Sequence, residues 1–306
     1  MKNNIIRSPF FYVGDKYKLM PQLEKLMPNN IDTYIEPFVG GGSSLINTRA
    51  KKYIANDIDK NVIRLHHFLS KYKNNPEQLM QELFFEIEKY GLSCSYLGIT
   101  VPINLKETYK KTYYSKYNKA SYEKMKNYFN KNKNNDKLLY LLLIYGFNHM
   151  IRFNKNGEFN LPVGNVDFNN NVHKALINYI DFVSKNNIEF HNEDYIDFLE
   201  KINITENSYV YLGPPYLISL SEYNKLWNES EEIRLCKYLD ELNNNGIKFG
   251  ITNLISHKDK FNNIFYEWSK KYYTYNIDSN YISFNDNTIK VSSQEVFVTN
   301  YEKKKQ

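Results

Sequence analysis

The chain has 306 residues, of which 42% are hydrophobic, and that is enough for one large α/β domain or two modest ones. A net charge of +6 and a pI near 8.9 are compatible with a polyanionic partner but do not require one. The two cysteines are far apart and fit no disulfide or metal-binding pattern, which predicts a cytoplasmic protein without a metal site. The polar N-terminus predicts that there is no leader, and no apolar run is long enough to span a bilayer.

The first segment with a functional interpretation is residues 8–22, which read SPFFYVGDKYKLMPQ. The segment begins with apolar residues, continues through a glycine and ends in the basic first turn of a predicted helix. Backbone amides of such a loop can bind a carboxylate or phosphate, whose negative charge Lys16 would neutralise. The alternative is a surface turn with a solvated lysine, and this segment by itself favours the alternative.

A glycine-rich turn, EPFVGGGS at 36–43, follows a short predicted strand at 33–35 and precedes a helix predicted from Ser44. This order is typical of the nucleotide-binding entry of doubly wound folds, since glycines let the backbone approach a ligand closely. The turn has neither the dinucleotide spacing nor the Lys-Ser/Thr pair of triphosphate binders. A plain turn is the alternative, although three successive glycines are costly unless they are used.

An acidic residue, Asp57, comes just after the second predicted strand at 52–55, within about 20 residues of the glycine turn. A carboxylate in that position can accept hydrogen bonds from both ribose hydroxyls of a nucleoside. Asp57 could instead cap the helix that begins at Lys60, but Asp59 is better placed for that role.

A helical pattern with interleaved lysines and tyrosines runs from residue 61 to about 135. Its lysines could contact phosphates, or the helices could be solvated in a compositionally biased chain, and the two interpretations have even support. The residues concerned are Lys106, Lys110, Lys111, Lys116, Lys119 and Lys124 with Tyr109, Tyr113, Tyr114, Tyr117 and Tyr122. A polar linker is predicted at 127–135 and an apolar helix at 137–145.

A β-hairpin is predicted within residues 147–164, because the pair Asn-Gly at 156–157 is a strong hairpin turn signal. Its flanks carry Arg152, Phe153 and Lys155 among several asparagines. A β-ribbon with Arg and Asn fits a DNA groove, where Asn can pair with adenine and Arg with guanine. An ordinary surface hairpin is equally consistent with this composition.

The second half of the chain alternates predicted helices and strands, which indicates a mostly parallel sheet. The elements are a helix at 172–185, strands at 188–190 and 209–212, a helix at 233–244 closed by Gly246, a strand at 247–252, and a closing strand pair at 272–278 and 294–301. Asp194 and Tyr195 follow the first of these strands, where the adenine of a cofactor could be contacted.

The strand at 209–212 stops at Gly213-Pro214-Pro215-Tyr216, since prolines cannot continue a sheet ladder. The stiff turn leaves carbonyl groups without local amide partners, and Tyr216 offers a ring on which a flat ligand can stack. A rigid acceptor beside a stacking ring suits the exocyclic amine of a nucleobase. Taken alone, a simple strand-terminating turn is the commoner explanation.

The turn at 213–216 resembles motif IV of the amino-methyltransferases, whose usual form is Asp, Asn or Ser followed by Pro-Pro-Tyr. The chain as a whole is similar to the Dam-type DNA adenine-N6 methyltransferases. The segments that carry the resemblance are 12–16, 36–43, 56–58, 147–164, 213–216 and 295–301. The sequence departs from the family at Gly213, where the family has a side chain, and at Asp15, where it commonly has Gly.

The resemblance implies a doubly wound, mostly parallel seven-stranded α/β sheet of the S-adenosylmethionine-dependent methyltransferase type. It places the catalytic and cofactor-binding domain in residues 1–60 and 171–306. An inserted, mainly helical target-recognition domain that carries the β-hairpin would occupy residues 61–170.

The resemblance also assigns residues to three sites. The catalytic residues would be Gly213, Pro214, Pro215 and Tyr216. S-adenosyl-L-methionine would contact Tyr12, Gly14, Lys16, Pro37, Gly40, Gly42, Ser43, Asp57, Ile58, Asp194 and Tyr195. Double-stranded DNA would contact Arg152, Phe153, Asn154, Lys155, Asn156, Asn160 and Pro162. No metal site is implied.

The implied reaction moves a methyl group from S-adenosylmethionine to N6 of adenine in a specific DNA sequence, after the base is flipped out of the duplex. Gly213 lacks the expected acceptor side chain, so impaired activity is predicted. The alternatives are a catalytically dead sequence-specific DNA-binding protein, a cytosine-N4 methyltransferase and a small-molecule methyltransferase. A cognate restriction endonuclease would be a further partner, and the hairpin resembles those of enzymes that read GAT-containing sites.

Overall fold

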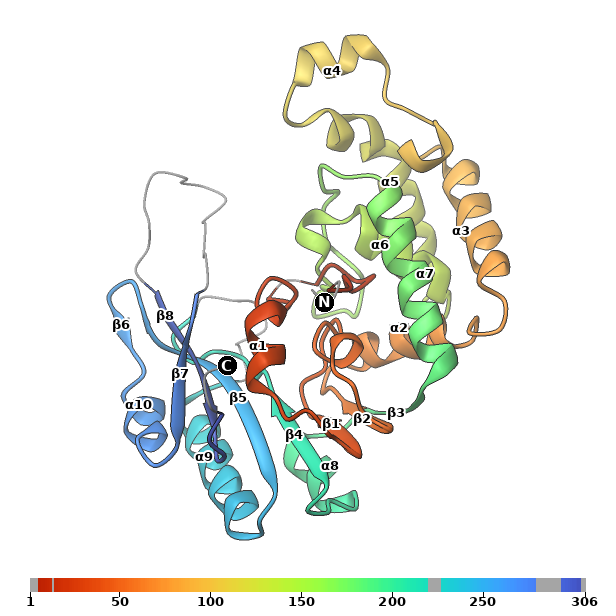
Figure 1. The fold of residues 1–306 in the computed structure, drawn as a ribbon. Coiled ribbons are helices and arrows are strands. Elements are labelled where there is room, and N and C mark those ends of the chain that lie inside the picture. Colours follow the sequence, from red (N-terminus) through yellow and green to blue (C-terminus); the bar gives the residue numbers. More distant parts are fainter. Residues whose placement is uncertain (1–4, 13, 220–226, 279–292, 304–306) are drawn as a thin grey trace. The chain divides into compact units, whose positions relative to one another are not determined.

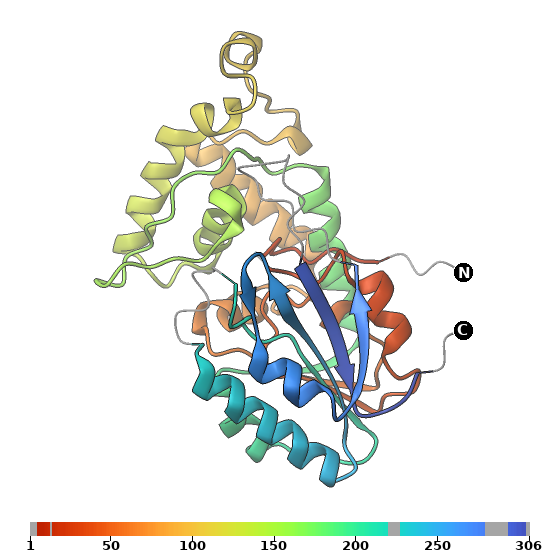
Figure 2. The same cartoon turned by 90° about the vertical axis from the view of Figure 1, so that its left-hand side faces the viewer.

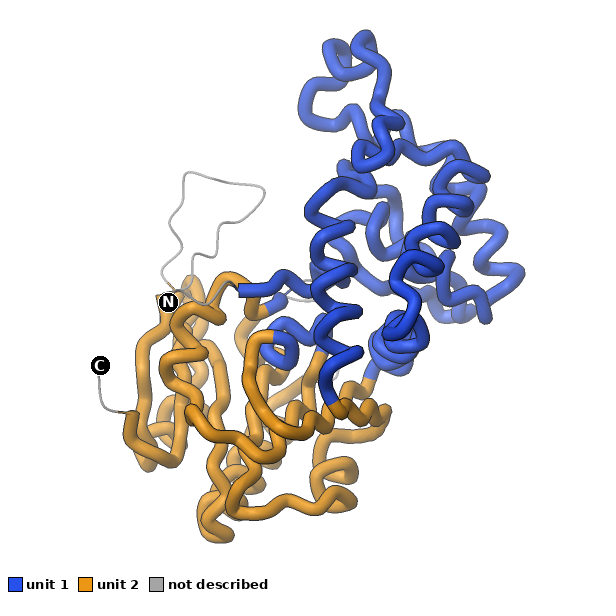
Figure 3. Tube along the Cα trace, turned by 45° about the vertical axis from the view of Figure 1, so that its right-hand side comes forward, with its two compact units in different colours: residues 1–15, 40–46, 59–186 blue, residues 16–39, 47–58, 187–306 orange. Residues whose placement is uncertain are grey.

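A computed structural model describes residues 5–12, 14–219, 227–278 and 293–303 of the chain. The chain divides into two compact units, which Figure 3 distinguishes by colour. Unit 1 comprises Met1–Asp15, Gly40–Ile46 and Asp59–Asn186, and unit 2 comprises Lys16–Val39, Asn47–Ile58 and Asn187–Gln306. The functional division predicted from the sequence, with boundaries at 60 and 171, stays a prediction.

Unit 2 contains the sheet, whose strand order is β3-β2-β1-β4-β5-β8-β7 (Figure 1). The strands are β1 (Thr33–Glu36), β2 (Lys52–Asn56), β3 (Asn187–His191), β4 (Ser208–Leu212), β5 (Lys248–His257), β7 (Tyr273–Ile277) and β8 (Ser293–Thr299), with the short β6 (Lys260–Phe261) paired to β5. The first five are parallel, and β8 runs antiparallel between β5 and β7. The predicted doubly wound, mostly parallel seven-stranded fold is confirmed, with β6 as an additional short strand.

The two central strands, β1 and β4, are adjacent although they are far apart in the sequence. Ile35 lies opposite Ile54 on one side and Val210 on the other, and all three side chains are buried. From β1 the chain proceeds outward to β2 and β3, and then crosses back to β4. This reversal makes the carboxyl ends of β1 and β4 the topological switch point, where doubly wound folds bind ligands.

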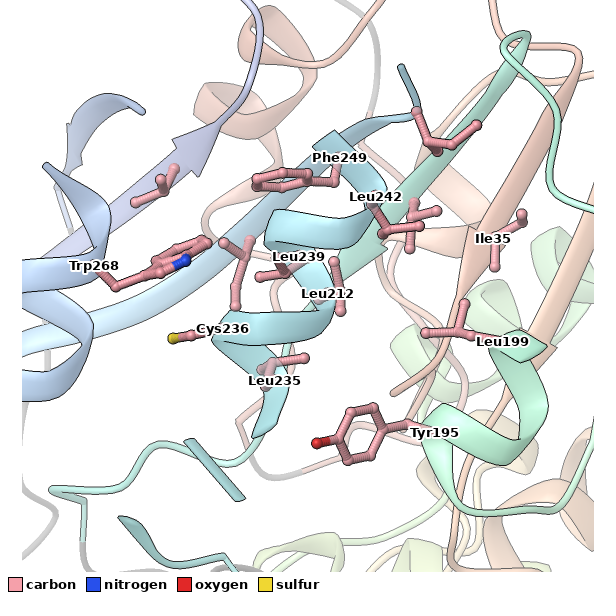
Figure 4. Close-up of a cluster of buried hydrophobic side chains, with 14 of the residues drawn as sticks. Ile35, Tyr195, Leu199, Leu212, Leu235, Cys236, Leu239, Leu242, Phe249 and Trp268 are labelled. Carbon is pink, nitrogen blue, oxygen red and sulfur yellow. The ribbon is translucent and has the colours of Figure 1, made fainter. Parts of the chain in front are cut away.

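The helices of unit 2 pack their apolar stripes on the sheet. They are α1 (Met20–Leu26), α8 (Tyr195–Lys201), α9 (Glu229–Asn244) and α10 (Asn263–Ser269). Leu235, Leu239 and Leu242 of α9 follow the i, i+4, i+7 spacing of a helix face and meet Phe249 of β5 in the main core cluster (Figure 4). Figure 2 shows α9 and α10 beside β5 from a second direction.

Unit 1 is mainly helical. Its helices are α2 (Lys60–Ser70), α3 (Pro76–Tyr90), α4 (Ile103–Tyr109), α5 (Tyr113–Lys131), α6 (Asp136–Tyr145) and α7 (Asn170–Lys185). Every residue of α6 from Leu138 to Tyr145 is buried, so this apolar helix forms the centre of the unit. The predicted cap of α2 is confirmed, because the Asp59 side chain accepts from the Asn61 amide at 2.8 Å.

Two local predictions are wrong. The helix predicted from Ser44 is a single 3₁₀ turn, Leu45–Asn47, because the chain must enter β2 at Lys52 and this short span leaves no room for more. The polar linker predicted from residue 127 is still helix as far as Lys131. Phe129 is fully buried there, and Asn130 exchanges two hydrogen bonds of 2.8 and 3.0 Å with the Phe159 backbone.

Other helix and strand boundaries differ from the predicted ones by a few residues. The helix α9 begins at Glu229, four residues earlier than predicted, because the Asn228 side chain caps the Glu231 amide at 3.1 Å. The strand β5 continues to His257 instead of ending at Thr252, since β8 pairs with it over that length. No helix in the described part of the chain is long and apolar enough to cross a membrane.

Candidate functional site

The carboxyl ends of the parallel strands bring together most of the predicted site residues of unit 2. Pro37 follows β1, Asp57 and Ile58 follow β2, Asp194 and Tyr195 follow β3, and Gly213, Pro214, Pro215 and Tyr216 follow β4. Pro37, Asp57 and Gly213 directly follow mostly buried strands, whereas Asp194 and Tyr195 lie a few residues beyond β3, whose side chains are exposed or half-buried. Parallel pairing then aligns the strand ends along one edge of the sheet.

Asn56 fixes three of these strand ends, and sequence reasoning did not assign it a role. Its side chain is fully buried, and its Nδ2 donates to the carbonyls of Pro37 at 3.1 Å and Glu193 at 3.0 Å. The Glu193 amide donates to the Asn56 side-chain oxygen at 3.0 Å, and the Val39 amide donates to the Asn56 carbonyl at 2.9 Å. A polar residue at the end of an otherwise apolar strand was the available signal.

Replacing Asn56 with leucine is expected to destabilise unit 2 by about 2–4 kcal/mol, because the buried carbonyls of Pro37 and Glu193 would lose their donor. Urea unfolding measures the change. The matched control is Asn203→Leu, which alters an exposed asparagine of the same unit. Equal unfolding midpoints for the two variants would contradict the role assigned to Asn56.

The end of β2 has the features expected for a nucleoside contact. Asp57 is half-buried, and its backbone carbonyl accepts from the Asn192 side chain at 2.7 Å. The next residue, Ile58, is 63% exposed. A carboxylate next to an exposed apolar side chain suits a ribose joined to a flat base.

The predicted adenine contacts Asp194 and Tyr195 are tied into the protein. Asp194 accepts from the Ile196 amide at 3.0 Å as the cap of α8, and Arg234 donates to its two carboxylate oxygens at 2.9 and 3.3 Å. Tyr195 is 5% exposed. Asp194 therefore has a structural role, and only its remaining acceptor positions are left for a ligand.

An aromatic cluster that sequence reasoning did not assemble surrounds Tyr195. The rings of Phe38 and Trp227 lie 5.0 and 5.9 Å from its ring centroid and 5.7 Å from each other. Glu232, whose side chain is fully buried, accepts from the Trp227 indole at 2.6 Å and from the amides of two asparagines, Asn253 and Asn262, at 2.8 Å. Burial raises the pKa of Glu232, and its three donors partly offset that effect.

The motif after β4 has an open position at Gly213. Its φ lies outside the left-handed region, and a Cβ built there would meet no atom closer than 3.7 Å. The nearest atoms belong to Lys16, Thr252 and Tyr211, which all carry hydrogen-bond donors. The backbone therefore does not require glycine at this position.

Tyr216 is 7% exposed, and polar contacts hold its hydroxyl group. The hydroxyl donates to Glu295 Oε1 at 2.5 Å and accepts from Lys16 Nζ at 2.5 Å. Sequence reasoning assigned Lys16 to the cofactor, whereas the structure places its ammonium on Tyr216. No role was predicted for Glu295, which belongs to the segment 295–301 that resembles the family.

In unit 1, the glycine turn needs its glycines. Gly40 and Gly42 have φ of +47° and +73°, which side chains rarely adopt. Ser8 Oγ donates to the Gly41 carbonyl at 2.5 Å, and the predicted cofactor residue Tyr12 lies with its ring 3.6 Å from a Cβ built on Gly40. The other residues predicted for this part of the site are Ser43, which is buried, and Gly14, which is exposed.

His66 supports the same turn and was missed by sequence reasoning. Its side chain is fully buried, with Nε2 2.9 Å from the Gly40 carbonyl and Nδ1 2.6 Å from the Tyr179 hydroxyl. A neutral ring satisfies both contacts when Nε2–H donates and Nδ1 accepts. Burial lowers the pKa of His66 to about 4, so the ring stays neutral at pH 7.

Acidification is expected to weaken unit 1 through His66. Because its folded-state pKa of about 4 lies below the unfolded value of 6.5, its contribution is complete above pH 6.5 and is lost as pH falls through 4. The lowered pKa of His66 corresponds to a loss of about 3 kcal/mol once the pH is below both values. Unfolding free energies between pH 7 and pH 4.5 measure this, and His66→Gln should flatten the profile. Superimposable profiles would refute the assignment.

The predicted hairpin turn is confirmed, but its two arms form only isolated antiparallel bridges, between Phe153 and Phe159 near the turn and between Gly146 and Val163 at the base. Gly157 has φ of +67°, a conformation that glycine adopts readily, whereas Asn156 has no positive φ. Arg152 donates to the side chain and the carbonyl of Asn160, both at 2.9 Å, so these two predicted DNA contacts bind each other in this structure.

The other predicted DNA residues fall into two groups. Asn154 accepts from the amides of residues 156 and 158 and therefore shapes the turn, and Phe153 packs on Phe159. Lys155, Asn156 and Pro162 are exposed and can meet a partner. The lysines predicted on the helical face are exposed apart from the half-buried Lys106, whereas Tyr122 lies in the core.

One departure from the family pattern concerns charge. Asp15, which adds a negative charge beside the predicted cofactor loop, lies 3.9 Å from the Arg7 guanidinium. This ion pair partly compensates the added charge within unit 1. Among the residues that the structure describes, no group of three or more His, Cys, Asp or Glu side chains could hold a metal ion.

The family model that matches the chain and the known proteins that resemble it agree with each other. A family model described as D12 class N6 adenine-specific DNA methyltransferase matches residues 12–283. Type II methyltransferase M.FokI of Planomicrobium okeanokoites is 35% identical, and modification methylase StsI of Streptococcus sanguinis 32% identical, each over 98% of this chain and 43% of its own length. DNA adenine methylase of Escherichia coli K12 is 28% identical over 54% of this chain and 49% of its own length. The chain thus spans less than half the length of these relatives.

Proposed function

Because the chain belongs to the D12 class of N6 adenine-specific DNA methyltransferases, we propose that it methylates N6 of adenine in a specific double-stranded DNA sequence. The observation that carries the proposal is the Pro-Pro-Tyr turn at the end of β4, beside β1 at the switch point of the sheet. Relatives are named as type II methyltransferases and modification methylases, which supports a place in a restriction–modification system with a cognate endonuclease.

The residues present fit S-adenosylmethionine as the methyl donor. In unit 2, the half-buried Asp57 would accept from the ribose hydroxyls, and the exposed Ile58 with the aromatic cluster around Tyr195 would contact the adenine. In unit 1, the left-handed glycines of the turn have no side chains of their own, which would let the donor approach their backbone closely. The bound donor would supply a methyl carbon bonded to a positively charged sulfur, which can leave as a neutral thioether.

The chain's own contribution to the reaction would be to orient the amine. The lone pair of an adenine amine is delocalised into the ring, so the nitrogen is a weak nucleophile. Acceptors that hold its hydrogens, namely the Pro214 carbonyl and a side chain at position 213, bias the nitrogen toward tetrahedral geometry. Position 213 is glycine here, and loss of such a positioned group typically costs about 10²–10⁴-fold in rate.

Adenine inside a duplex is inaccessible, so the base would be flipped out and stacked on Tyr216. The exposed Lys155 and Asn156 of the hairpin, with the exposed lysines of α5 and of the turn before it, would contact the duplex. Such phosphate contacts predict binding that weakens steeply as salt increases.

A catalytically dead DNA-binding protein is a second candidate, and the observation that favours it is Gly213 itself. Mass analysis of nucleosides from DNA treated with the chain and with its Gly213→Asp variant separates the candidates. N6-methyladenine supports the proposal, N4-methylcytosine redirects it to another base, and salt-sensitive binding without methylation by either protein supports the dead-protein alternative.

A further inference from the structure

We infer that Lys16 and Glu295 are positioning residues, which hold the phenol of Tyr216 so that its ring forms a fixed platform for the target base. The inference rests on the proposed function and deepens it. Both residues act through the Tyr216 hydroxyl, and neither needs to contact the base or the donor.

The three groups form a directed chain of hydrogen bonds. The Lys16 ammonium donates to the Tyr216 oxygen at 2.5 Å, and the Tyr216 hydroxyl donates to Glu295 Oε1 at 2.5 Å. The ammonium also lies 3.5 Å from the same carboxylate oxygen. Each group therefore has a defined role as donor or acceptor, and the phenol cannot rotate away without breaking two charge-assisted bonds.

The burial of Lys16, Tyr216 and Glu295 restricts the movement of their side chains. The Glu295 side chain is fully buried and the Lys16 side chain is 14% exposed. A buried carboxylate is unfavourable unless it is paired and hydrogen-bonded, so Lys16 and Tyr216 together stabilise its charge. The ring itself packs with Ile218 and Leu254, which fixes its body while the polar contacts fix its tip.

The Lys16 ammonium contacts the hydroxyl end of the Tyr216 side chain. It lies 4.3 Å from the ring centroid but 2.5 Å from the hydroxyl oxygen, and the two distances together place it beside the oxygen. The ammonium therefore does not lie over the centre of the ring face on which the proposed base would stack. A lysine centred over the ring would instead compete with the base for the same face.

The three residues come from segments that the fold brings together within unit 2. Lys16 precedes α1, Tyr216 follows β4, and Glu295 belongs to β8. The Lys16 Cε also lies 3.7 Å from a Cβ built on Gly213. A carboxylate at position 213 would thus also lie near Lys16, so in the Gly213→Asp chain the Glu295 variant isolates the contact with Tyr216.

The test uses the Gly213→Asp chain, in which methylation of DNA can be measured as kcat and as KM for the donor. Tyr216→Phe removes only the hydroxyl and should lower kcat about 10–100-fold, the usual effect of losing a hydrogen bond to a charged group. Lys16→Met and Glu295→Gln should lower kcat comparably, whereas Lys16→Arg should recover part of the loss. KM for the donor should change less than twofold.

A double-mutant cycle supplies the decisive comparison. If Glu295 acts through the phenol, adding Glu295→Gln to Tyr216→Phe should lower kcat no further. Independent losses that multiply would overturn the inference, as would a rise in KM for the donor without a fall in kcat. Lys18→Met, which alters an exposed lysine two residues away, is the control and should leave both constants unchanged.

Failure of the inference and failure of the proposed function give different results. If the Gly213→Asp chain transfers no methyl groups, the proposed function is wrong and the platform role falls with it. If that chain is active but the cycle shows independent effects, only the inference is wrong. Should a charge variant fail to fold, Tyr216→Phe alone decides, because an unchanged kcat for that variant overturns the inference.

Discussion

Replacing Gly213 with aspartate is expected to raise the rate of DNA methylation by about 10²–10⁴-fold. The carboxylate would accept from the adenine amine and, together with the Pro214 carbonyl, direct its lone pair. The site can receive this side chain because the Gly213 backbone is not left-handed and a Cβ there has only ordinary contacts. Lys16, Thr252 and Tyr211 would offer donors to the new carboxylate.

Transfer of labelled methyl groups to DNA measures the effect, with product nucleosides identified by mass. Two matched variants separate shape from charge. Gly213→Ala adds the Cβ without an acceptor, so its methylation rate should equal that of the starting chain. Gly213→Asn adds a neutral acceptor, so its rate should lie between those of the alanine and aspartate variants. An aspartate variant no faster than the alanine variant would remove position 213 from the mechanism.

Substitution of Gly42 by alanine is expected to destabilise unit 1 by about 2–4 kcal/mol and to weaken donor binding at least tenfold. A side chain at φ of +73° costs about 1–2 kcal/mol. The new Cβ would also lie 3.1 Å from Cε1 of His66, whose ring is held by Gly40 and Tyr179 and cannot move aside.

A second glycine of unit 1 provides the control for this substitution. Gly98 has nearly the same φ, +77°, but a Cβ built there meets nothing within 4 Å. Gly98→Ala should therefore show only the backbone cost, about 1–2 kcal/mol, and leave donor affinity unchanged. Urea unfolding and calorimetric titration with S-adenosylmethionine make the comparison. Equal destabilisation by the two variants would mean that the contact with His66 carries no energy.

The two largest expected effects differ because the fold requires glycine at position 42 but not at position 213. At Gly42 the backbone conformation and a rigid neighbour demand the absence of a side chain. At Gly213 neither demand exists, so glycine there removes a chemical group without serving the fold. This contrast supports the interpretation that Gly213 reduces activity while the surrounding framework is intact.

Much of the architecture could be predicted from the sequence because its signals are local. Apolar runs of strand length predicted β1, β2 and β4, and the residues after them were assigned to one edge of the sheet. Asp59 as a helix cap and Asn-Gly as a hairpin turn were also correct, since caps and turns depend on a few adjacent residues. Local signals failed at Ser44, where the short path to β2 prevents a helix.

Tertiary structure alone decided which residues support the site. Nothing near Lys16 in the sequence indicates that it meets Tyr216 and Glu295, and nothing near His66 indicates that it holds the Gly40 carbonyl. These pairs lie far apart along the chain, and their contacts depend on strand order and helix packing. A local pattern specifies the conformation of a segment, whereas the partner of a buried polar group is fixed only when the whole unit has folded around it.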